Sequence, residues 1–467
     1  MPSPRERAYD FAVIGGGTAG MTVATQVAMA GKRVALIEAE RTGGDCLYTG
    51  CVPSKSLIAS ARALQTIREA GVHGISVSEI SLDLGQTIDR KQRIIEVIEP
   101  HDSPERLARA GVEVIAGHAR FTGPRTLAVG DAQLRAGNFA ITTGSQPAVP
   151  CIPGLAESGY VTNVEMLDRR EVPRRLAVIG AGSIGLELGQ TFARFGSEVT
   201  VIGRGPRMLR RDEPASTDVL RRALEREGIT FHMQTMVERV EATGTGKRLR
   251  LRNAVGEETG IETDEILVAV GRKPRTENLG LDLAGVDPGE AGIQVDKRLR
   301  TSASHIWACG DVTGPPYWTH AAEDQARTVA ANVLGGRKTW SARAIPWATY
   351  TDPEVAGVGL TIEEARQRHG DRIDVLQWPY GAIDRARTDG ATAGLMTVIL
   401  TRGWTRGRLG GEIAGAHIVG QRAGDLINQF AFMMAWRLPA GMLARTVQTY
   451  PSLSLGVRQV VARHWTK

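Results

Sequence analysis

Short apolar runs that end in glycine-rich turns are the main hydrophobic pattern of this chain, and the pattern occurs twice. Residues Phe11 to Ile14 form an apolar run that leads into Gly15–Gly20 and then into a stretch rich in Ala, Val and Met. Residues Leu176 to Ile179 lead in the same way into Gly180–Gly185. Each pattern predicts a strand, a tight glycine turn and a helix.

A second apolar strand is expected after each predicted helix. The first, Val34–Ile37, ends in Glu38, about twenty residues after the glycines, where a carboxylate can accept hydrogen bonds from a ribose. The second, Val199–Ile202, ends at Gly203. The chain therefore carries two candidate dinucleotide sites.

The glycines of each turn have separate physical roles. The first glycine allows the tight turn, the second lets backbone amides approach a pyrophosphate, and the third lets the helix pack closely on the strand. The helix N-terminus then faces the phosphates. The residues expected in these roles are Gly15, Gly17 and Gly20 in the first site and Gly180, Gly182 and Gly185 in the second.

From about Ala344 the pattern changes to short strands, such as 397–400 and 413–419, followed by an amphipathic helix around Asp425 to Trp436. The predicted fold class is α/β, with two Rossmann-like dinucleotide-binding domains and an α+β C-terminal domain.

Two cysteines, Cys46 and Cys51, lie in the segment 43–55 just after the first site. We interpret them as a redox disulfide beside a flavin. Four cysteines in a large chain do not make a secreted disulfide framework, and in the cytosol a paired disulfide is more often catalytic than structural. Cys151 and Cys309 are isolated and are expected to be ordinary packed residues, with a minor redox role left open for Cys309.

Length and composition limit the remaining classes. A chain of 467 residues is too long for one core and suggests about three domains. The net charge of +6 comes mostly from arginines spread along the chain, so we expect no nucleic-acid partner. Apolar runs are short, and residues 1–7 lead directly into the first strand, so we expect no membrane span and no signal peptide. We therefore expect a cytoplasmic protein, and no metal site is predicted.

The glycine turns, Glu38 and the cysteine segment together resemble the flavin-dependent pyridine nucleotide disulfide oxidoreductases, which include dihydrolipoamide dehydrogenase, glutathione reductase and mercuric reductase. The resemblance covers nearly the whole chain. It implies an FAD domain of residues 1–147 and 271–343, an inserted nicotinamide domain of residues 148–270, and a dimer interface domain of residues 344–467 that forms a homodimer.

The resemblance also assigns residues to the flavin chemistry. It implies flavin contacts at Thr143, Gly144, Gly271 and Asp311, and a Lys55–Glu187 ion pair near the reactive flavin nitrogen. A purely structural ion pair is the alternative. Of the two sulfurs, the resemblance places that of Cys51 next to the flavin and gives Cys46 the exchange with the substrate. The helix expected from Pro53 onward would favour a thiolate through its N-terminal amides.

Four arginines follow Gly203 and bear on the choice of nicotinamide. NAD sites usually have an acidic residue at that position, whereas a guanidinium fork suits a ribose phosphate. We therefore predict NADPH, with Arg204 as the first contact and Arg210 as the second. A solvated arginine-rich loop and the use of NADH are the alternatives.

The C-terminal segment departs from the family pattern. Tyr450 occupies the position of the histidine, and Leu455 that of the glutamate, of the proton-transferring dyad in lipoamide and glutathione reductases. A phenol is a poor base at neutral pH. Tyrosine at this position resembles mercuric reductases, but the cysteine pair with which those usually end is absent from 462–467, and we expect no N-terminal metal-binding domain.

The electron acceptor is therefore left open. The leading interpretation is a mercuric-reductase-like enzyme whose acceptor is an unidentified small molecule, thiol or metal ion. The alternatives are a dihydrolipoamide-dehydrogenase-like enzyme with altered proton chemistry and a redox sensor or scaffold flavoprotein with low turnover.

Overall fold

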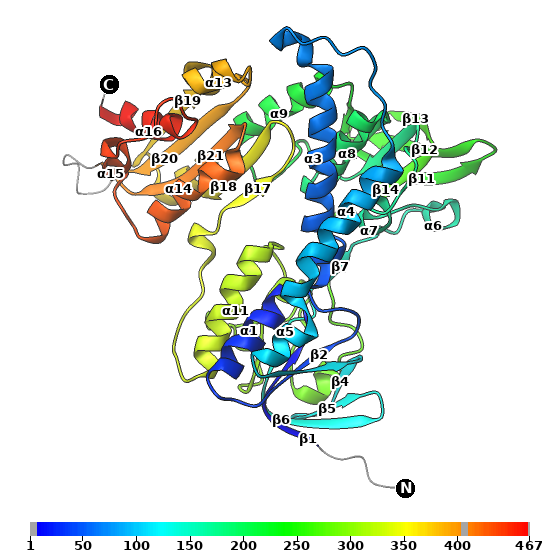
Figure 1. Cartoon of the computed structure of the whole chain (residues 1–467), viewed down its shortest axis with the longest axis vertical. Helices are drawn as coiled ribbons and strands as arrows, with labels where there is room; N and C mark the ends of the chain where they lie inside the picture. Colours follow the sequence, from blue (N-terminus) through cyan, green and yellow to red (C-terminus); the bar gives the residue numbers. More distant parts are fainter. Residues whose placement is uncertain (1–6, 403–409, 466–467) are drawn as a thin grey trace. The chain divides into compact units, whose positions relative to one another are not determined.

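The computed structural model describes residues 7–402 and 410–465, which form two compact units (Figure 1). Unit 1 consists of the described part of Met1–Ser56 together with Gln86–Ala148 and Gly271–Ser341. Unit 2 consists of Leu57–Gly85, Val149–Val270 and the described part of Ala342–Lys467.

A seven-stranded sheet forms the centre of unit 1, in the order β3-β2-β1-β6-β5-β4 with β16 also paired to β6. Strands β1, β2, β3, β6 and β16 pair in parallel, and β4, β5 and β6 form an antiparallel meander. The strands are β1 (Arg7–Ile14), β2 (Val34–Glu38), β3 (Val112–Ala116), β4 (Ala119–Gly123), β5 (Thr126–Val129), β6 (Ala132–Ile141) and β16 (Ile306–Ala308).

Alternating side chains of β1 pack on opposite faces of this sheet. Phe11 and Val13 belong to the core formed with helices α1 (Thr18–Met29) and α11 (Thr319–Val333), which lie side by side in Figure 1. Ala12 and Ile14 belong to a second core, on the face covered by the meander. Burial on both faces explains why this strand is a continuous apolar run in the sequence.

The other elements of unit 1 surround the carboxyl ends of the parallel strands or connect them. Strands β7 (Ser145–Pro147) and β15 (Arg272–Pro274) form an antiparallel pair. The helices are α2 (Gly44–Tyr48), α5 (Pro104–Arg109) and α10 (Leu281–Ala284), with 3₁₀ turns η2 (Glu99–Asp102) and η3 (Asp311–Thr313). Helices α3 (Cys51–Arg68) and α4 (Leu84–Ile98) each have residues in both units.

Helix α3 begins at Cys51, two residues before the expected start at Pro53. Proline is tolerated in the first turn of a helix because its missing N–H would have no intrahelical acceptor there. Cys51 therefore lies within the first turn, at the position where the helix dipole acts most strongly on a thiolate.

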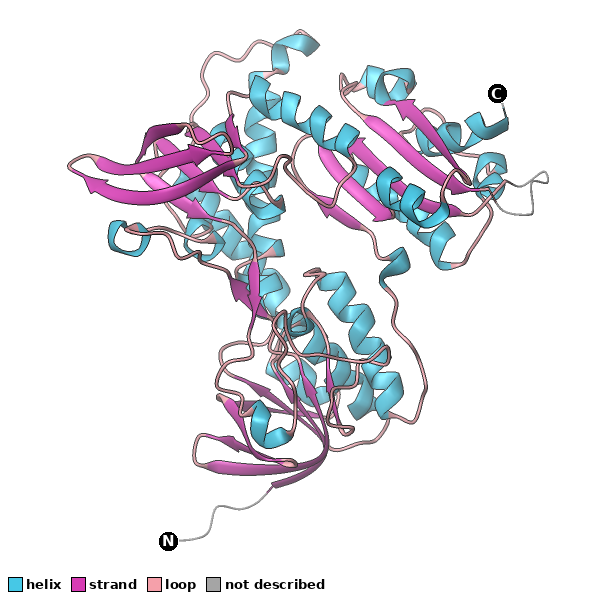
Figure 2. Cartoon of the chain, turned by 180° about the vertical axis from the view of Figure 1, so that it is seen from behind, coloured by secondary structure: helices cyan, strands magenta, loops and turns pink. Residues whose placement is uncertain are grey.

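Unit 2 contains a parallel sheet in the order β10-β9-β8-β14 and an antiparallel sheet in the order β11-β12-β13. Figure 2 shows the long strands of the antiparallel sheet. These strands are β8 (Arg175–Ile179), β9 (Glu198–Gly203), β10 (Thr230–Met233), β11 (Thr235–Thr243), β12 (Gly246–Asn253), β13 (Glu258–Thr263) and β14 (Glu265–Val268). The helices here are α6 (Leu155–Ser158), α7 (Asn163–Met166), α8 (Ser183–Phe195) and α9 (Pro214–Arg226), with η1 (Ala70–His73).

The C-terminal part of unit 2 is built on a five-stranded antiparallel sheet in the order β17-β18-β21-β20-β19. Its strands are β17 (Trp347–Thr349), β18 (Glu354–Gly359), β19 (Ile373–Pro379), β20 (Leu395–Thr401) and β21 (Ile413–Gly420). Its helices are α12 (Ile362–His369), α13 (Asp384–Thr388), α14 (Ala423–Ala435), α15 (Ala440–Arg445) and α16 (Ser454–Ala462), with 3₁₀ turns η4 (Ala342–Ala344), η5 (Tyr380–Ala382) and η6 (Arg463–Trp465).

The core of this region contains the fully buried Phe430 of α14 and Tyr380. The strands expected at 397–400 and 413–419 lie within β20 and β21, and the expected amphipathic helix is α14.

The predicted α/β fold class is confirmed. Two sheets of parallel strands each carry a strand, glycine turn and helix, and an α+β region follows them. Among the described helices, none is both long and apolar enough to span a bilayer.

Candidate functional site

The first glycine turn lies between β1 and α1 and brings the chain close to residue 142. Gly15 has φ +104°, and a Cβ there would lie 2.5 Å from the carbonyl oxygen of Thr142. A Cβ on Gly20 would lie 1.9 Å from the carbonyl oxygen of Gly15. Only glycine fits these positions without moving the backbone. In contrast, nothing lies within 4 Å of a Cβ built on Gly17, so the approach to the first amides of α1 is open.

Glu38 lies at the end of β2, as expected. Its Oε2 accepts a hydrogen bond from the backbone N–H of Gly16 (2.5 Å), and its Oε1 accepts one from Glu40 (2.8 Å). These bonds fix the carboxylate beside the glycine turn, and each oxygen keeps further lone pairs for a ribose hydroxyl.

The expected flavin residues of the later segments gather around Asp311, the first residue of η3. Ser145 Oγ donates to Asp311 Oδ2 (2.5 Å), and Arg272 Nε donates to Ser145 Oγ (2.6 Å). Arg272 also forms an ion pair with Asp45, one residue before Cys46. Burial raises the pKa of Asp311, while Ser145 and Arg272 act in the opposite direction.

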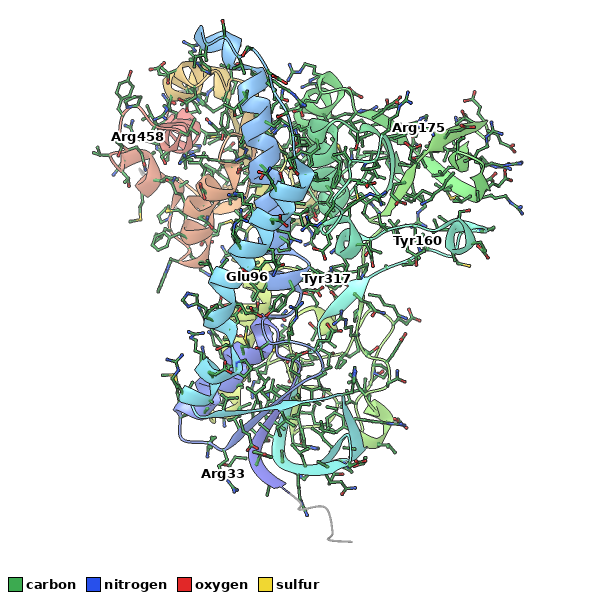
Figure 3. The ribbon with its side chains drawn as sticks, turned by 45° about the vertical axis from the view of Figure 1, so that its right-hand side comes forward. Arg33, Glu96, Tyr160, Arg175, Tyr317 and Arg458 are labelled. Carbon is green, nitrogen blue, oxygen red and sulfur yellow. The ribbon has the colours of Figure 1, made fainter. Side chains whose placement is uncertain are left out.

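The neighbours of this network include several further predicted residues. Thr143 Oγ1 donates to the carbonyl oxygen of Arg275 (2.6 Å), whose N–H donates to Gly144 (2.9 Å). Gly271, just before β15, accepts from Ala148 (3.0 Å). Tyr317, labelled in Figure 3, interacts electrostatically with Asp311 and has a pKa raised mainly by burial.

Sequence reasoning missed the two residues that connect this network, Ser145 and Arg272. It also missed Gln325 of α11, whose Oε1 accepts from the N–H of Gly310 (2.7 Å). Arg272 directly follows the predicted Gly271, but its partner Asp45 is 227 positions away in sequence.

The two cysteines lie close together in unit 1, Cys46 on α2 and Cys51 at the start of α3, and both are in the thiol form. The hydrogen bond with Cys51 and then burial raise the pKa of Cys46 above its ordinary value. Thr319 Oγ1 of α11 lies 3.4 Å from Cys51 Sγ, another contact that the sequence did not reveal. Two thiols in hydrogen-bonding contact can form a disulfide with little movement of the chain.

The second glycine turn lies between β8 and α8 of unit 2 and carries Gly180, Gly182 and Gly185. Residue 203 ends β9, and a Cβ there would meet Met233 at 2.7 Å. Met233 therefore occupies the space into which a longer side chain at position 203 would project.

The arginine segment 204–211 follows β9. Arg204, Arg207, Arg210 and Arg211 are all exposed. Leu209, in contrast, is buried, and its N–H donates to the carbonyl oxygen of Ala181 in the second glycine turn (3.0 Å). This bond fixes the arginine segment beside the turn.

The remaining predicted residues lie apart in sequence and belong to different elements. Lys55 lies on α3 in unit 1, while Glu187 is buried on α8 in unit 2 and accepts from the N–H of Tyr350 (2.8 Å). Their pairing spans the two units and stays a prediction. Tyr450 is 67% exposed, and its Oη donates to Asp384 Oδ2 (3.3 Å). Leu455 is partly buried near the start of α16.

Two dinucleotide-binding folds, each built on parallel strands, and a cysteine pair define a flavin-linked oxidoreductase that uses a pyridine nucleotide. Residues 9–326 match the family model described as pyridine nucleotide-disulphide oxidoreductase, and residues 345–460 match the dimerisation domain of the same family. The chain belongs to this family and is an FAD-dependent disulfide oxidoreductase.

Individual relatives span almost the whole chain. It is 32% identical to a mercuric reductase of Bacillus cereus, over 97% of this chain and 71% of the relative. This chain is 36% identical to a dihydrolipoyl dehydrogenase of Thermus scotoductus, over 97% of this chain and 96% of the relative. A solved structure of the HOCl-induced flavoprotein disulfide reductase RclA from Escherichia coli matches with a TM-score of 0.85 and 30% identity, over 97% of this chain and 99% of that one.

The family uses FAD and a nicotinamide nucleotide, and unit 1 fits FAD. The open approach to the amides of α1 suits a pyrophosphate, Glu38 suits a ribose, and the Asp311 network lies in the same unit as the cysteine pair.

Proposed function

We propose that this enzyme passes electrons from NADPH through FAD to the Cys46–Cys51 pair and then to an external disulfide that reacts at Cys46. The observation that carries the proposal is the contact between the two thiols in the unit that carries the FAD cradle. When bound, FAD accepts a hydride from the nicotinamide and passes an electron pair to a disulfide. Cys51 is the thiol next to the flavin, and Cys46 is the thiol that exchanges.

The domain assignment is part of the same proposal. Residues 1–147 and 271–343 bind FAD, through Gly15, Gly17, Gly20, Glu38, Thr143, Gly144, Gly271 and Asp311. Residues 148–270 bind the nicotinamide nucleotide through Gly180, Gly182 and Gly185. Lys55 and Glu187 pair beside the flavin. Residues 344–467 form the interface of a homodimer, in keeping with the dimerisation-domain match. The cytoplasmic location stays a prediction.

NADPH rather than NADH is favoured by two features around the end of β9. Gly203 has no side chain, so the acidic group that usually binds a free ribose is absent at the end of β9. Within residues 7–402 and 410–465, the guanidinium groups of Arg204 and Arg210 form no ion pair, so they are free to bind a phosphate dianion.

Charge reversal at residue 204 tests this choice. Arg204→Glu should weaken NADPH binding by about 1–3 kcal/mol, because a charge-assisted hydrogen bond is replaced by repulsion. Binding of NADH should change much less. The measurement is the rate of flavin reduction by stopped flow at low nucleotide concentration, with Arg222→Glu on α9 as the control of equal charge change. Equal or better use of NADH by the unmodified protein contradicts the assignment.

A metal ion is the second candidate acceptor. Several of the similar proteins are named mercuric reductases, and Tyr450 stands where lipoamide and glutathione reductases have histidine. Steady-state NADPH oxidation with lipoamide, glutathione disulfide and a thiol-complexed mercuric ion separates the candidates. Turnover with the mercuric ion alone would overturn the proposal of a disulfide acceptor, and rapid flavin reduction without any turnover would favour a redox sensor.

A further inference from the structure

The helix that carries Cys46 is too short to be stable on its own. Helix α2 has five residues, whereas isolated helices shorter than about 12–15 residues are marginal in water. Gly43 (φ +105°) precedes it, Gly44 (φ +58°) begins it, and Gly50 separates it from α3. Glycine gives the backbone additional conformational freedom. The position of Cys46 therefore depends on the tertiary contacts that α2 makes.

Asp45, the residue before Cys46, makes one such contact through its charge. Its carboxylate forms a hydrogen-bonded ion pair with Arg272 of β15, and its Oδ1 lies 3.8 Å from a guanidinium nitrogen of Arg275. Only 13% of the Arg272 side chain is exposed, so salt screens this pair less than it screens a surface ion pair. One carboxylate thus joins α2 to two arginines of the same segment.

The two-stranded ribbon of β7 and β15, which carries Arg272, is held together along its length. Its strands pair from Ser145 to Pro147 and from Arg272 to Pro274. Beyond these pairs, the N–H of Ala148 donates to the carbonyl oxygen of Gly271 (3.0 Å). The ribbon therefore gives α2 a fixed point of attachment.

Arg272 also contacts the carboxylate that is expected to face the flavin. Its Nε donates to Ser145 Oγ (2.6 Å) and lies 3.6 Å from Asp311 Oδ2. Ser145 Oγ in turn donates to the same Asp311 oxygen (2.5 Å). Because a guanidinium group is planar and rigid, it holds Asp45 and Asp311 in a defined geometry.

We propose that Asp45 is a positioning residue for Cys46. Through Arg272 it attaches α2 to the β7–β15 ribbon and to Asp311, so that the Cys46 sulfur stays in contact with Cys51 in the dithiol state. The inference rests on the proposed role of Cys46 and Cys51 as the redox pair.

Such an attachment stabilises the Cys46–Cys51 disulfide relative to the dithiol. Two sulfurs that are already held together lose little chain entropy when the S–S bond forms, so their effective concentration is high. When the attachment is removed, the dithiol gains freedom that the disulfide does not gain, because the S–S bond itself restrains α2. The reduction potential of the pair should therefore become more positive.

Equilibration of the FAD-loaded protein with reduced and oxidised dithiothreitol measures this effect. The cysteine pair and the buffer exchange two electrons and two protons, and alkylation followed by mass spectrometry gives the oxidised fraction of the pair. Asp45→Asn should make the disulfide about tenfold less stable, which corresponds to about 30 mV. Asp45→Glu keeps the charge and should give a smaller shift. Glu277→Gln, which removes an exposed ion pair with Lys273 next to Arg272, is the matched control.

A double-mutant cycle tests whether Asp45 acts through Arg272. Arg272→Gln should shift the potential in the same direction, and Asp45→Asn should add little to it in the Arg272→Gln background. The flavin absorbance of Asp45→Asn should show the FAD content of the unmodified protein. Additive shifts, or an unchanged potential in Asp45→Asn with FAD retained, would overturn the proposal. If Asp45→Asn loses FAD, Asp45→Glu takes its place in the same comparison.

Hydrogen exchange separates this inference from the proposed function. In the fully reduced protein, the backbone amides of residues 43–50 should exchange faster in Asp45→Asn than in the unmodified protein, while those of β16 should not change. Unchanged exchange in residues 43–50 would contradict the attachment. A pair that never forms a disulfide in the unmodified protein, with faster exchange in Asp45→Asn, would contradict the proposed function and support the attachment.

Discussion

At the scale of single residues, the position of Cys51 decides which sulfur carries negative charge. Cys51 is the first residue of α3, and Thr319 Oγ1 lies 3.4 Å from its sulfur. A helix N-terminus stabilises a thiolate, whereas the Thr319 hydroxyl acts on both sulfurs, since its hydrogen bond also lowers the pKa of Cys46. Cys46 lies outside this helix, and its raised pKa favours the protonated form. The pair is thus asymmetric, as the proposed exchange at Cys46 and the proposed flavin contact at Cys51 require.

This asymmetry predicts a spectroscopic difference between cysteine variants. Two-electron reduction of the FAD-loaded protein should produce a broad long-wavelength absorbance, because the Cys51 thiolate can donate charge to an oxidised flavin beside it. Cys51→Ser should remove this absorbance completely while the protein stays yellow. Cys151→Ser, at an exposed cysteine of unit 2, is the control and should retain the absorbance. If the long-wavelength absorbance persists in Cys51→Ser, the thiolate belongs to another residue.

At the scale of elements, the arginine segment is anchored where it enters α9. Asp212 is 5% exposed, and its Oδ1 accepts from Trp347 Nε1 of β17 (2.8 Å). Glu213 Oε2 accepts from the N–H of Ile362 at the start of α12 (3.0 Å). Two consecutive acidic residues thus connect the segment after β9 to strand β17 and helix α12 of the C-terminal part of unit 2.

The buried Asp212 predicts a pH-dependent stability. Burial raises the pKa of Asp212 to about 6 from an unfolded value near 4. Its contribution to stability is therefore fully present below pH 4 and is lost as pH rises to about 6. Asp212→Asn keeps the acceptor for Trp347 and removes the charge. The free energy of unfolding of this variant, relative to that of the unmodified protein, should therefore rise by about 2–3 kcal/mol between pH 4 and pH 7.5.

Thermal or denaturant unfolding at several pH values measures this difference. Asp218→Asn, at an exposed residue of α9, should show no comparable trend. A constant difference between Asp212→Asn and the unmodified protein across this pH range would mean that Asp212 is not a buried charge.

At the scale of the whole molecule, large apolar side chains remain exposed in the region matched to the dimerisation domain. Phe432 is 58% exposed and Trp436 70%, and the two are four residues apart on one face of α14 and its C-terminus. Val447 is 93% exposed. Exposed aromatic groups of this kind are typical of an interface.

Disruption of this surface should convert the proposed homodimer to monomers. Each aromatic residue at the centre of an interface typically contributes about 2 kcal/mol or more, so Phe432→Glu and Trp436→Arg should each weaken association by roughly 30-fold or more. Light scattering over a concentration series measures the change. Val255→Glu, at an 80% exposed apolar residue outside the region matched to the dimerisation domain, is the control. An unmodified protein that is monomeric at all concentrations would contradict the prediction.

The sequence alone determined the fold class, both glycine turns and the segment that holds the cysteine pair. These features depend on local backbone requirements, so they leave a local pattern. A Cβ at Gly15 would lie 2.5 Å from a carbonyl oxygen and one at Gly20 only 1.9 Å, and Glu38 follows these glycines at the expected spacing. The dinucleotide folds could therefore be predicted from periodicity and glycine spacing.

Only the tertiary structure decided which distant residues complete the sites. Asp45 and Arg272 are 227 positions apart and Cys51 and Thr319 are 268 apart, yet the side chains of each pair are in contact. Met233 fills the space at Gly203 because β10 lies beside β9. Such contacts arise from strand order and helix packing, which bring together side chains whose sequence neighbourhoods carry no common signal.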